Sequence, residues 1–276
     1  MRILVTGGSG FIGSNLVPAL QARGHEPIVY DLNEPGTDTP RVIGDVTDCD
    51  ALCDAMSGAD AVVHLAAVSG VADCEDDPIR AARINVGAEV LTCASRIGIE
   101  RLVYASSMAA VRGDSWYGAT KKALEALADG ITAATTLRCI GLRFSNVYGP
   151  NSRHKTSVVA TWMRAALQGR PLQVHDNGTA VRDFIYITDV CSSIIRAMER
   201  EPGVGAGGIK TWRNISVGDL AAIVADVTGA DVDGCDVALY EPTTFFRGRG
   251  PCVALEDGIV LTWGWYKRTH GEGLAA

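Results

Sequence analysis

The chain has 276 residues, which is enough for one large or two unequal domains with a well-buried core. Its hydrophobic (47%) and charged (21%) fractions are ordinary for a soluble globular protein. The net charge of −7 gives no basic surface for nucleic acid, and no apolar run approaches the ~20 residues that cross a bilayer. Residues 3–5 lead directly into glycines, unlike a signal peptide, so we expect a cytoplasmic protein with neither nucleic-acid nor membrane partners.

The positions of the cysteines and histidines argue against a metal site and against a disulfide-bonded fold. The eight cysteines are scattered and form no C-x-x-C pair, and the five histidines are isolated. In a chain of this length the pattern favours reduced, mostly buried thiols. We therefore predict no metal site.

Short β-branched runs alternate with helical segments up to about residue 190. The expected strands are 2–6, 26–31, 40–44, 60–65, 101–106 and 136–144. The expected helices between them are 11–23, 48–57, 78–97 and 115–130. This alternation predicts right-handed βαβ units and an α/β fold with a Rossmann-type, doubly wound parallel sheet.

The alternation loosens after Gly149-Pro150. The segments expected there are a helix at 155–169, a strand at 172–175, helices at 188–200 and 216–228, and a glycine-rich turn at 202–208. We predict a dinucleotide-binding domain at 1–150, to which the chain returns around 178–200. Residues 151–276 should mainly form a smaller, mixed substrate lobe.

Glycines follow the first strand with a spacing that suits a dinucleotide. Gly7, Gly10 and Gly13 permit a tight turn, close approach of a pyrophosphate, and close packing of the next helix, in that order. The helix N-terminus then faces the phosphates. Phe11 and Ile12, between the last two glycines, belong to the same predicted site.

Acidic residues end the next two strands. Asp31 can accept both ribose hydroxyls of an adenosine and repels a 2′-phosphate, which favours NAD over NADP. Its alternative reading is a solvated loop acid. Asp45, followed by Val46, either bonds an adenine amino group or caps the helix at 48–57.

The fourth strand ends in small residues that leave room for a cofactor, namely Leu65, Ala66 and Ala67. His64, just before them, is expected to be a core histidine with its hydrogen bonds satisfied.

Tyr117 and Lys121 stand four residues apart and therefore on one face of a helix. A phenol with a pKa of ~10 is a poor base near neutral pH. Lys121 and an oxidised nicotinamide would both favour the phenolate and lower the pKa of Tyr117. Ser106 and Ser107, which end the fifth strand, can place a hydroxyl against the same substrate oxygen. The alternative is a chance Tyr-x-x-x-Lys on a surface helix.

With these motifs in place, the chain resembles the NAD-dependent nucleotide-sugar epimerase/dehydratase family, a branch of the extended short-chain dehydrogenases/reductases. The matching stretches are 6–13, 64–67, 85–86, 104–107, 117–121, 143–150 and 182–189. The resemblance implies a nucleotide-diphosphate sugar as substrate, NAD as cofactor, and a homodimer built on the alanine-rich helices 78–97 and 115–130.

The resemblance also implies roles for single residues. Tyr117 resembles the catalytic base, Lys121 its electrostatic and ribose-binding partner, and Ser107 the proton-sharing hydroxyl. Further cofactor contacts are implied for Asn85 and Phe144. The implied substrate contacts are Asn146, Val158, Arg182 and Arg247.

Two of these substrate contacts have alternatives. Arg182 could instead form an ion pair with nearby acids, and Arg249 could replace Arg247 at a phosphate. The stretch 151–159, which contains Val158, matches epimerase-like members, although it could also be a solvated loop leading into a helix.

The sequence departs from the family near the catalytic serine. If the family's motif is aligned from Val111, where the family usually has Val-Tyr-Gly, Met108 takes the position of the catalytic serine. If it is aligned along the strand from Tyr104, Ser107 takes that position. We favour Ser107, because packing sets the register of a strand while a loop can absorb a residue. The loop before Tyr117 is also shorter than is usual in the family.

In this family, 4-epimerisation, 4,6-dehydration and reduction of a 4-keto sugar can all use such a site. Dehydratases and decarboxylases of the family carry an acid directly after the catalytic hydroxyl, where this chain has Met108, Ala109 and Ala110. We therefore predict a 4-epimerase of the UDP-glucose/UDP-galactose type, working through a transient 4-keto sugar. The alternatives are a 4-ketoreductase, a 4,6-dehydratase, and a non-catalytic module that senses a dinucleotide.

Overall fold

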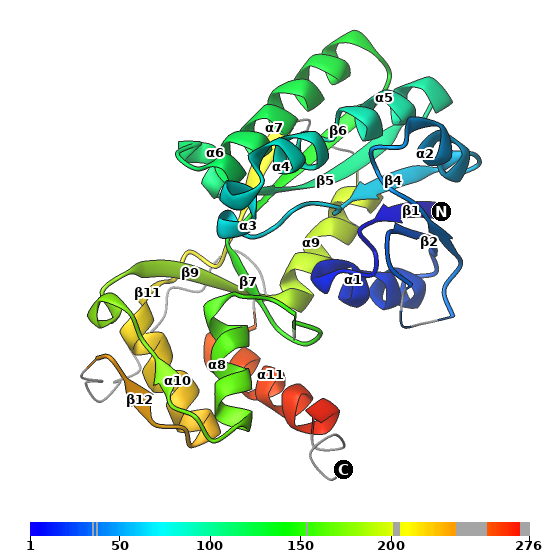
Figure 1. Cartoon of the computed structure of the whole chain (residues 1–276). Coiled ribbons are helices and arrows are strands. Elements are labelled where there is room, and N and C mark those ends of the chain that lie inside the picture. Colours follow the sequence, from blue (N-terminus) through cyan, green and yellow to red (C-terminus); the bar gives the residue numbers. More distant parts are fainter. Residues whose placement is uncertain (35, 37, 153, 201–204, 236–252, 271–276) are drawn as a thin grey trace. The chain divides into compact units, whose positions relative to one another are not determined.

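The computed structural model describes residues 1–34, 36, 38–152, 154–200, 205–235 and 253–270 (Figure 1). The chain forms two compact units. The first contains Met1–Phe144 and Cys191–Ile209, and the second contains Ser145–Val190 and Lys210–Ala276. None of the described helices is both long and apolar enough to cross a membrane.

The first unit is built on a seven-stranded parallel sheet. Its strands are β1 (Arg2–Thr6), β2 (Glu26–Asp31), β3 (Arg41–Ile43), β4 (Ala61–His64), β5 (Arg101–Ser107), β6 (Arg138–Phe144) and β10 (Gly205–Ile209). Their order is β10-β6-β5-β4-β1-β2-β3, so the direction of winding reverses between β1 and β4. This arrangement confirms the Rossmann-type sheet, and such reversal points are where α/β sheets bind ligands.

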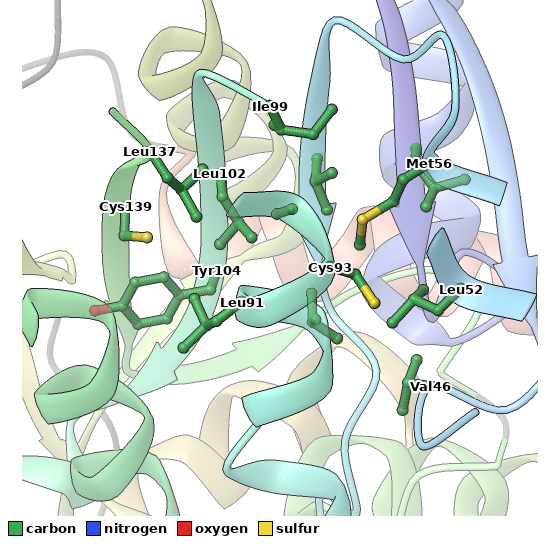
Figure 2. Packing of buried hydrophobic residues seen from close by; sticks show 14 of the residues in the cluster. Val46, Leu52, Met56, Leu91, Cys93, Ile99, Leu102, Tyr104, Leu137 and Cys139 are labelled. Carbon is green, nitrogen blue, oxygen red and sulfur yellow. The ribbon is translucent and has the colours of Figure 1, made fainter. Parts of the chain in front are cut away.

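Helices cover both faces of this sheet. They are α1 (Phe11–Ala22), α2 (Cys49–Met56), α3 (Val71–Asp76), α4 (Pro78–Asn85), α5 (Ala88–Ile97), α6 (Ala109–Arg112), α7 (Trp116–Ala134) and α9 (Ile187–Glu199). α1 and α9 lie on one face, and α2, α5 and α7 on the other (Figure 1). The core under the second group includes Leu52, Leu91, Leu102 and Tyr104, all at most 3% exposed (Figure 2). Burial on both faces explains the continuous apolar runs of the strands.

The structure corrects two expected elements. The helix expected at 78–97 is broken at Gly87, which adopts a left-handed φ of +63° between α4 and α5. A Cβ at this position would lie 2.9 Å from the His64 ring, so only glycine fits the close approach. The expected turn at 202–208 contains strand β10 from Gly205 onwards, because pairing with β6 satisfies the backbone of a glycine-rich edge.

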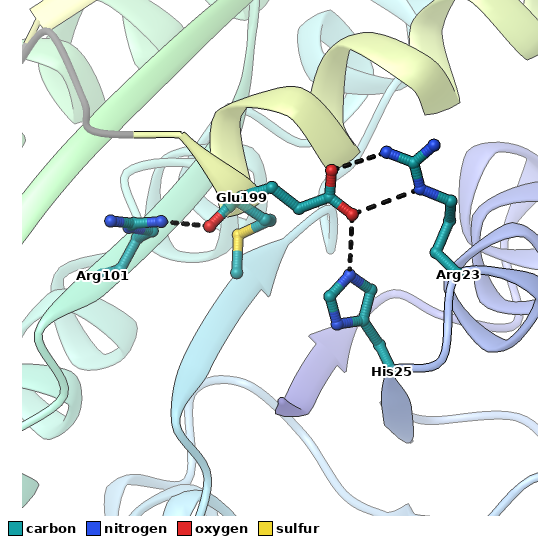
Figure 3. Close-up of polar contacts among 5 residues, drawn as sticks. Arg23, His25, Arg101 and Glu199 are labelled. Carbon is teal, nitrogen blue, oxygen red and sulfur yellow. Dashed lines mark hydrogen bonds and ion pairs between the residues drawn. The ribbon is translucent and has the colours of Figure 1, made fainter.

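Polar contacts tie the returning helix α9 to the sheet (Figure 3). Glu199 at its end accepts hydrogen bonds from the Arg23 guanidinium and lies 3.2 Å from the His25 ring. Arg101 of β5 donates to the carbonyl of Met198. The contacts connect residues 97 and 176 positions apart along the chain, which helps to hold the returning segment on the first unit.

The second unit is mixed, as expected. Its larger sheet has the order β11 (Asn214–Ser216), β9 (Val181–Tyr186), β7 (Asn146–Tyr148), with β7 parallel and β11 antiparallel to β9. Its smaller sheet pairs β8 (Leu172–Gln173) with β12 (Val232–Asp233). The helical segments are α8 (Val158–Leu167), η1 (Asp176–Gly178), α10 (Val217–Thr228) and α11 (Leu255–His270). The strand expected at 172–175 corresponds to β8. Strands β7, β9, β11 and β12 and helix α11 were not anticipated; three of these strands have only two or three residues and carry little periodicity.

Candidate active site

The loop between β1 and α1 leaves no room for side chains at its glycines. Gly7 has a left-handed φ of +71°, and a Cβ there would lie 2.6 Å from the Ala66 nitrogen. A Cβ on Gly13 would collide with the Gly7 carbonyl, so α1 packs directly on the loop. Gly10, the N-cap of α1, would meet only that carbonyl, at 3.2 Å. The loop therefore has the open backbone that a pyrophosphate requires. The half-buried residues that open α1 are Phe11 and Ile12.

Asp31, at the end of β2, is held beside this loop. One carboxylate oxygen accepts the Ser9 N–H at 3.0 Å, and the other accepts the Asn33 N–H at 3.0 Å. A half-buried acid fixed in this way is better suited to accept ribose hydroxyls than a freely solvated loop acid.

Asp45 is not the cap of the next helix, so that alternative is wrong. Asp48 caps α2, because its carboxylate accepts the Ala51 N–H at 3.1 Å. Asp45 accepts the N–H and the hydroxyl of Thr47, each at 2.9 Å, in a local turn. Val46 is buried in the core. A contact between Asp45 and adenine stays a prediction.

The loop after β4, which contains Leu65, Ala66 and Ala67, is positioned by Asn85. This fully buried amide accepts the Val68 N–H at 2.7 Å and donates to the Val68 carbonyl at 3.0 Å. The Asn85 side chain is therefore engaged in hydrogen bonds to the protein backbone. We infer that Asn85 acts on a cofactor through the loop it holds.

His64 is buried, as expected, but only one of its two ring nitrogens has a hydrogen-bond partner among the described residues. Its Nδ1 lies 2.7 Å from the Thr6 hydroxyl, whereas its Nε2 has no hydrogen-bond partner among the described residues. Burial, assisted by the positive charge of Lys121, lowers the pKa of His64 to about 3. The ring is therefore neutral at physiological pH.

Ser107, Tyr117 and Lys121 meet at the carboxyl end of β5. Ser115 caps α7 by accepting the Gly118 N–H at 3.1 Å, which places Tyr117 in the first turn and Lys121 one turn later. The Ser107 hydroxyl lies close enough to the Tyr117 phenol to lower the pKa of that phenol. Lys121 donates from Nζ to the Ala105 carbonyl at 2.9 Å. The three residues thus form one polar cluster.

This geometry supports Ser107, and not Met108, as the serine of the candidate site. Ser107 is the last residue of β5 and is paired in register with the buried Phe144 of β6. Met108 lies beyond the strand, and its N–H donates to the Phe144 carbonyl at 3.0 Å. Ser107, and not Met108, therefore accompanies Tyr117.

The pKa of Tyr117 does not follow the expectation. Burial raises the pKa of the phenol, the nearby Ser107 hydroxyl lowers it, and the neighbouring Cys74 raises it. Lys121 is not among the groups that lower it, since its ammonium is directed to Ala105. Burial also lowers the pKa of Lys121 to about 8. Within the chain itself, Ser107 is thus the group that favours the phenolate.

Ser106 has a different partner from the one predicted. Its hydroxyl donates to Glu125 of α7, and Glu125 also accepts two bonds from the Arg143 guanidinium, at 2.8 and 2.7 Å. Burial raises the pKa of Glu125, but the bonds from Arg143 and Ser106 outweigh it and the pKa is lowered overall. This partly buried ion pair and the Ser106 bond connect β5, β6 and α7 and so support the helix that carries Tyr117. Sequence reasoning missed it, because the pairing is not local.

The second unit holds a pocket of about 250 Å³ that brings together three predicted substrate residues. Asn146, Val158 and Arg182 all line it, alongside Phe184 and other apolar side chains. Asn146 donates to the Asp183 carbonyl at 2.9 Å, which fixes its amide on β9. Arg182 is exposed and forms no ion pair with any described residue, which argues against the alternative reading of a surface ion pair.

Asp183, next to Arg182, is a further residue that sequence reasoning missed. Its carboxylate accepts bonds from the Ser145 hydroxyl at 2.7 Å and from the N–H and hydroxyl of Thr211. It therefore fixes the start of β7 and the approach to β11 around the pocket. Arg247 and Arg249 lie outside the described residues.

A family model described as the NAD dependent epimerase/dehydratase family matches residues 3–209. The chain belongs to this family. It is 30% identical to a UDP-glucose 4-epimerase of Mycolicibacterium smegmatis, over 95% of this chain and 97% of that protein. It is also 30% identical to a UDP-N-acetyl-alpha-D-glucosaminuronate decarboxylase of Bacillus cytotoxicus, over 72% of each.

The fold comparison agrees with this assignment. The UDP-glucose 4-epimerase of Thermotoga maritima, solved with UDP-glucose, superposes with a TM-score of 0.86. The two chains are 26% identical, and the match covers 98% of this chain and 99% of the other. The chain is therefore an enzyme of the epimerase/dehydratase family, with NAD as its cofactor.

The loop residues fit NAD, and this gives a first testable prediction. Gly7→Ala should weaken NAD binding about tenfold or more, because the new Cβ pushes against Ala66 on the neighbouring loop. The measurement is titration calorimetry with NAD. Gly24→Ala is the control, since Gly24 has a similar φ of +78° but open space around it. Unchanged NAD affinity in Gly7→Ala would contradict the assigned loop.

Proposed function

We propose that this family member is a nucleotide-sugar 4-epimerase that interconverts UDP-glucose and UDP-galactose through a transient 4-keto sugar. The observation that carries the proposal is the placement of Ser107 beside Tyr117 at the end of β5, followed by residues without a carboxylate. Residues 108–113 contain no acid, and Asp114 forms an exposed ion pair with Arg112 at 3.2 Å. The extra acid that dehydration and decarboxylation use in this family is thus missing from its usual position.

In this proposal the chain's residues move one proton. Tyr117 takes the proton of the sugar 4-hydroxyl, while Ser107 bonds the same oxygen and stabilises the phenolate. Lys121, with a pKa of about 8, is protonated at neutral pH, and its ammonium holds the end of β5 through the Ala105 carbonyl. NAD, when bound, supplies reversible removal of hydride from the sugar carbon. After the flat 4-keto sugar turns over, hydride returns to the opposite face of its C4 carbon and Tyr117 returns the proton to the C4 oxygen, which completes the inversion.

The pocket of the second unit is proposed to hold the nucleotide diphosphate. Arg182 offers a guanidinium fork that matches a diphosphate, and Asn146 offers an amide on the same wall. In this scheme the first unit binds NAD and the second binds the sugar nucleotide. Exposed apolar residues, Ile97 on α5 and Leu127 on α7, support a homodimer as part of the same proposal.

The test is incubation of the purified protein with UDP-glucose and NAD, followed by separation of the sugar nucleotides. We expect UDP-galactose to form with no net production of NADH, and the reverse conversion from UDP-galactose. A stable 4-keto-6-deoxy sugar in this assay would contradict the epimerase. So would release of carbon dioxide from UDP-glucuronic acid, or stoichiometric NADH consumption on an added keto sugar, in parallel incubations.

Arg182→Ala tests the pocket in the same assay. It should raise KM about 10- to 100-fold with a smaller change in kcat, because a bond to a charged group is worth about 1.5–3 kcal/mol. The matched control is Arg170→Ala, an exposed arginine of the same unit that bonds to Gln168. An unchanged KM in Arg182→Ala would remove the proposed diphosphate contact.

A further inference from the structure

Three cysteines far apart in the sequence meet between two helices of the first unit. Cys49 and Cys53 stand one turn apart on α2, and Cys93 is buried on the neighbouring α5. The sulfurs of Cys53 and Cys93 are 2.6 Å apart, and those of Cys49 and Cys93 are 3.1 Å apart. All three sulfurs lie within 4.8 Å of one another. Sequence reasoning predicted no metal site, because it could not see this convergence.

Simple apolar packing does not account for the arrangement. A buried cysteine usually behaves as a small hydrophobic residue whose sulfur contacts carbon. Here each sulfur is within reach of another sulfur, although Leu52 and Met56 provide apolar surface nearby (Figure 2). The cluster therefore concentrates three soft ligand atoms at one point.

Positive groups of the first unit lie beside Cys49. Cys49 is the first residue of α2, where the positive end of the helix dipole lies. The Arg96 guanidinium of α5 also donates to its sulfur at 3.9 Å.

We propose that Cys49, Cys53 and Cys93 form a binding site for a soft d¹⁰ metal ion, Zn²⁺ or Cu⁺. Three thiolates suit such ions, and binding releases the three thiol protons to solvent. Zinc–thiolate bonds of about 2.3 Å place tetrahedral sulfurs about 3.8 Å apart, which small side-chain rotations reach from the present spacing. Cu⁺ needs no further ligand, whereas Zn²⁺ takes a fourth from water, to which the half-exposed Cys49 and Cys53 give access.

Such an ion would cross-link α2 to α5 and stabilise the first unit. The cluster is separate from the proton-transfer residues, which lie on β5 and α7. Occupancy should therefore change stability much more than chemistry. The inference is independent of which reaction the enzyme catalyses.

The experiment is anaerobic titration of the reduced, metal-free protein with Zn²⁺ and with Cu⁺, each in competition with a chelator. Cd²⁺ serves as a spectroscopic probe of thiolate coordination. We expect one ion per chain, a thiolate-to-cadmium absorption band, protection of three thiols from alkylation, and a higher thermal unfolding temperature. Binding of only one of Zn²⁺ and Cu⁺ supports the site and identifies its ion.

Single variants assign the ligands. Cys49→Ser and Cys53→Ser should each weaken binding about tenfold or more and reduce the cadmium band. Cys93→Ala should have the same effect. Because Cys93 is buried, its replacement could prevent folding, and in that case the Cys49→Ser and Cys53→Ser variants still test the proposal. Cys191→Ala is the control, because Cys191 is buried on α9 away from the cluster. Absence of binding, binding unaffected by Cys49→Ser and Cys53→Ser, or a Cys53–Cys93 disulfide in protein handled without oxygen would overturn the proposal.

Discussion

Replacing Tyr117 with phenylalanine should lower kcat about 10²- to 10⁴-fold and leave NAD affinity nearly unchanged. The reason is that the change removes one oxygen atom, the one that lies beside the Ser107 hydroxyl, and leaves the ring in place. The measurement is steady-state interconversion of UDP-glucose and UDP-galactose beside titration calorimetry with NAD. Turnover that stays within a few-fold of the wild type would remove Tyr117 from the chemistry.

Tyr104→Phe is the matched control for that variant. Tyr104 is also a buried tyrosine, but its hydroxyl has no hydrogen-bond partner among the described residues, so its removal should leave kcat unchanged. The pH dependence adds a second readout. Because the Ser107 hydroxyl lowers the pKa of Tyr117, Ser107→Ala should move the rising limb of the kcat/KM profile to higher pH.

Replacing Lys121 with methionine should make the protein more stable at pH 7 while it reduces turnover. Burial lowers the pKa of Lys121 from 10.5 to about 8, which means that the charged form costs the folded state about 3 kcal/mol. Methionine removes this cost but also the hydrogen bond to the Ala105 carbonyl, worth about 1 kcal/mol. We therefore expect a net gain of about 2 kcal/mol in the free energy of unfolding.

The pH dependence of this gain has a defined sign. Below pH 8 Lys121 is charged in both the folded and the unfolded state, so the folded protein bears the full cost. Between pH 8 and 10.5 the folded state loses its proton first, and the wild type becomes more stable relative to Lys121→Met. Urea unfolding at pH 7 and pH 10 measures the difference. Lys122→Met, at the exposed neighbouring position, should show neither effect, and an equal gain in both variants would contradict the explanation.

Most of the first unit was predictable because its signals are local. Each of β1, β2, β4, β5 and β6 is a short apolar run, and the glycines after β1 are adjacent in sequence to the helix they serve. Where the prediction failed, a partner distant in sequence decided the conformation. Gly87 breaks the expected long helix beside the His64 ring, and the glycines after 204 form a strand because β6 lies next to them.

In the candidate site, too, local features were predictable and features that depend on distant partners were not. The positions of Ser107, Tyr117 and Lys121 on a strand end and one helix face follow from residue spacing. The partner of Ser106 could not be predicted, because Glu125 and Arg143 come from different elements. The direction of the Tyr117 pKa was also out of reach, since burial is a property of the packed core.

By itself, the sequence predicted most strands and helices of the first unit, the glycine loop after β1 and the candidate proton-transfer residues, because these predictions depend on neighbours within a few positions of the chain. Only the tertiary structure decided which polar groups are buried, which residues line the pocket beside Arg182, and that Cys49, Cys53 and Cys93 meet. The physical reason is that burial, electrostatic shifts and ligand clusters arise between segments that the chain brings together only when it packs.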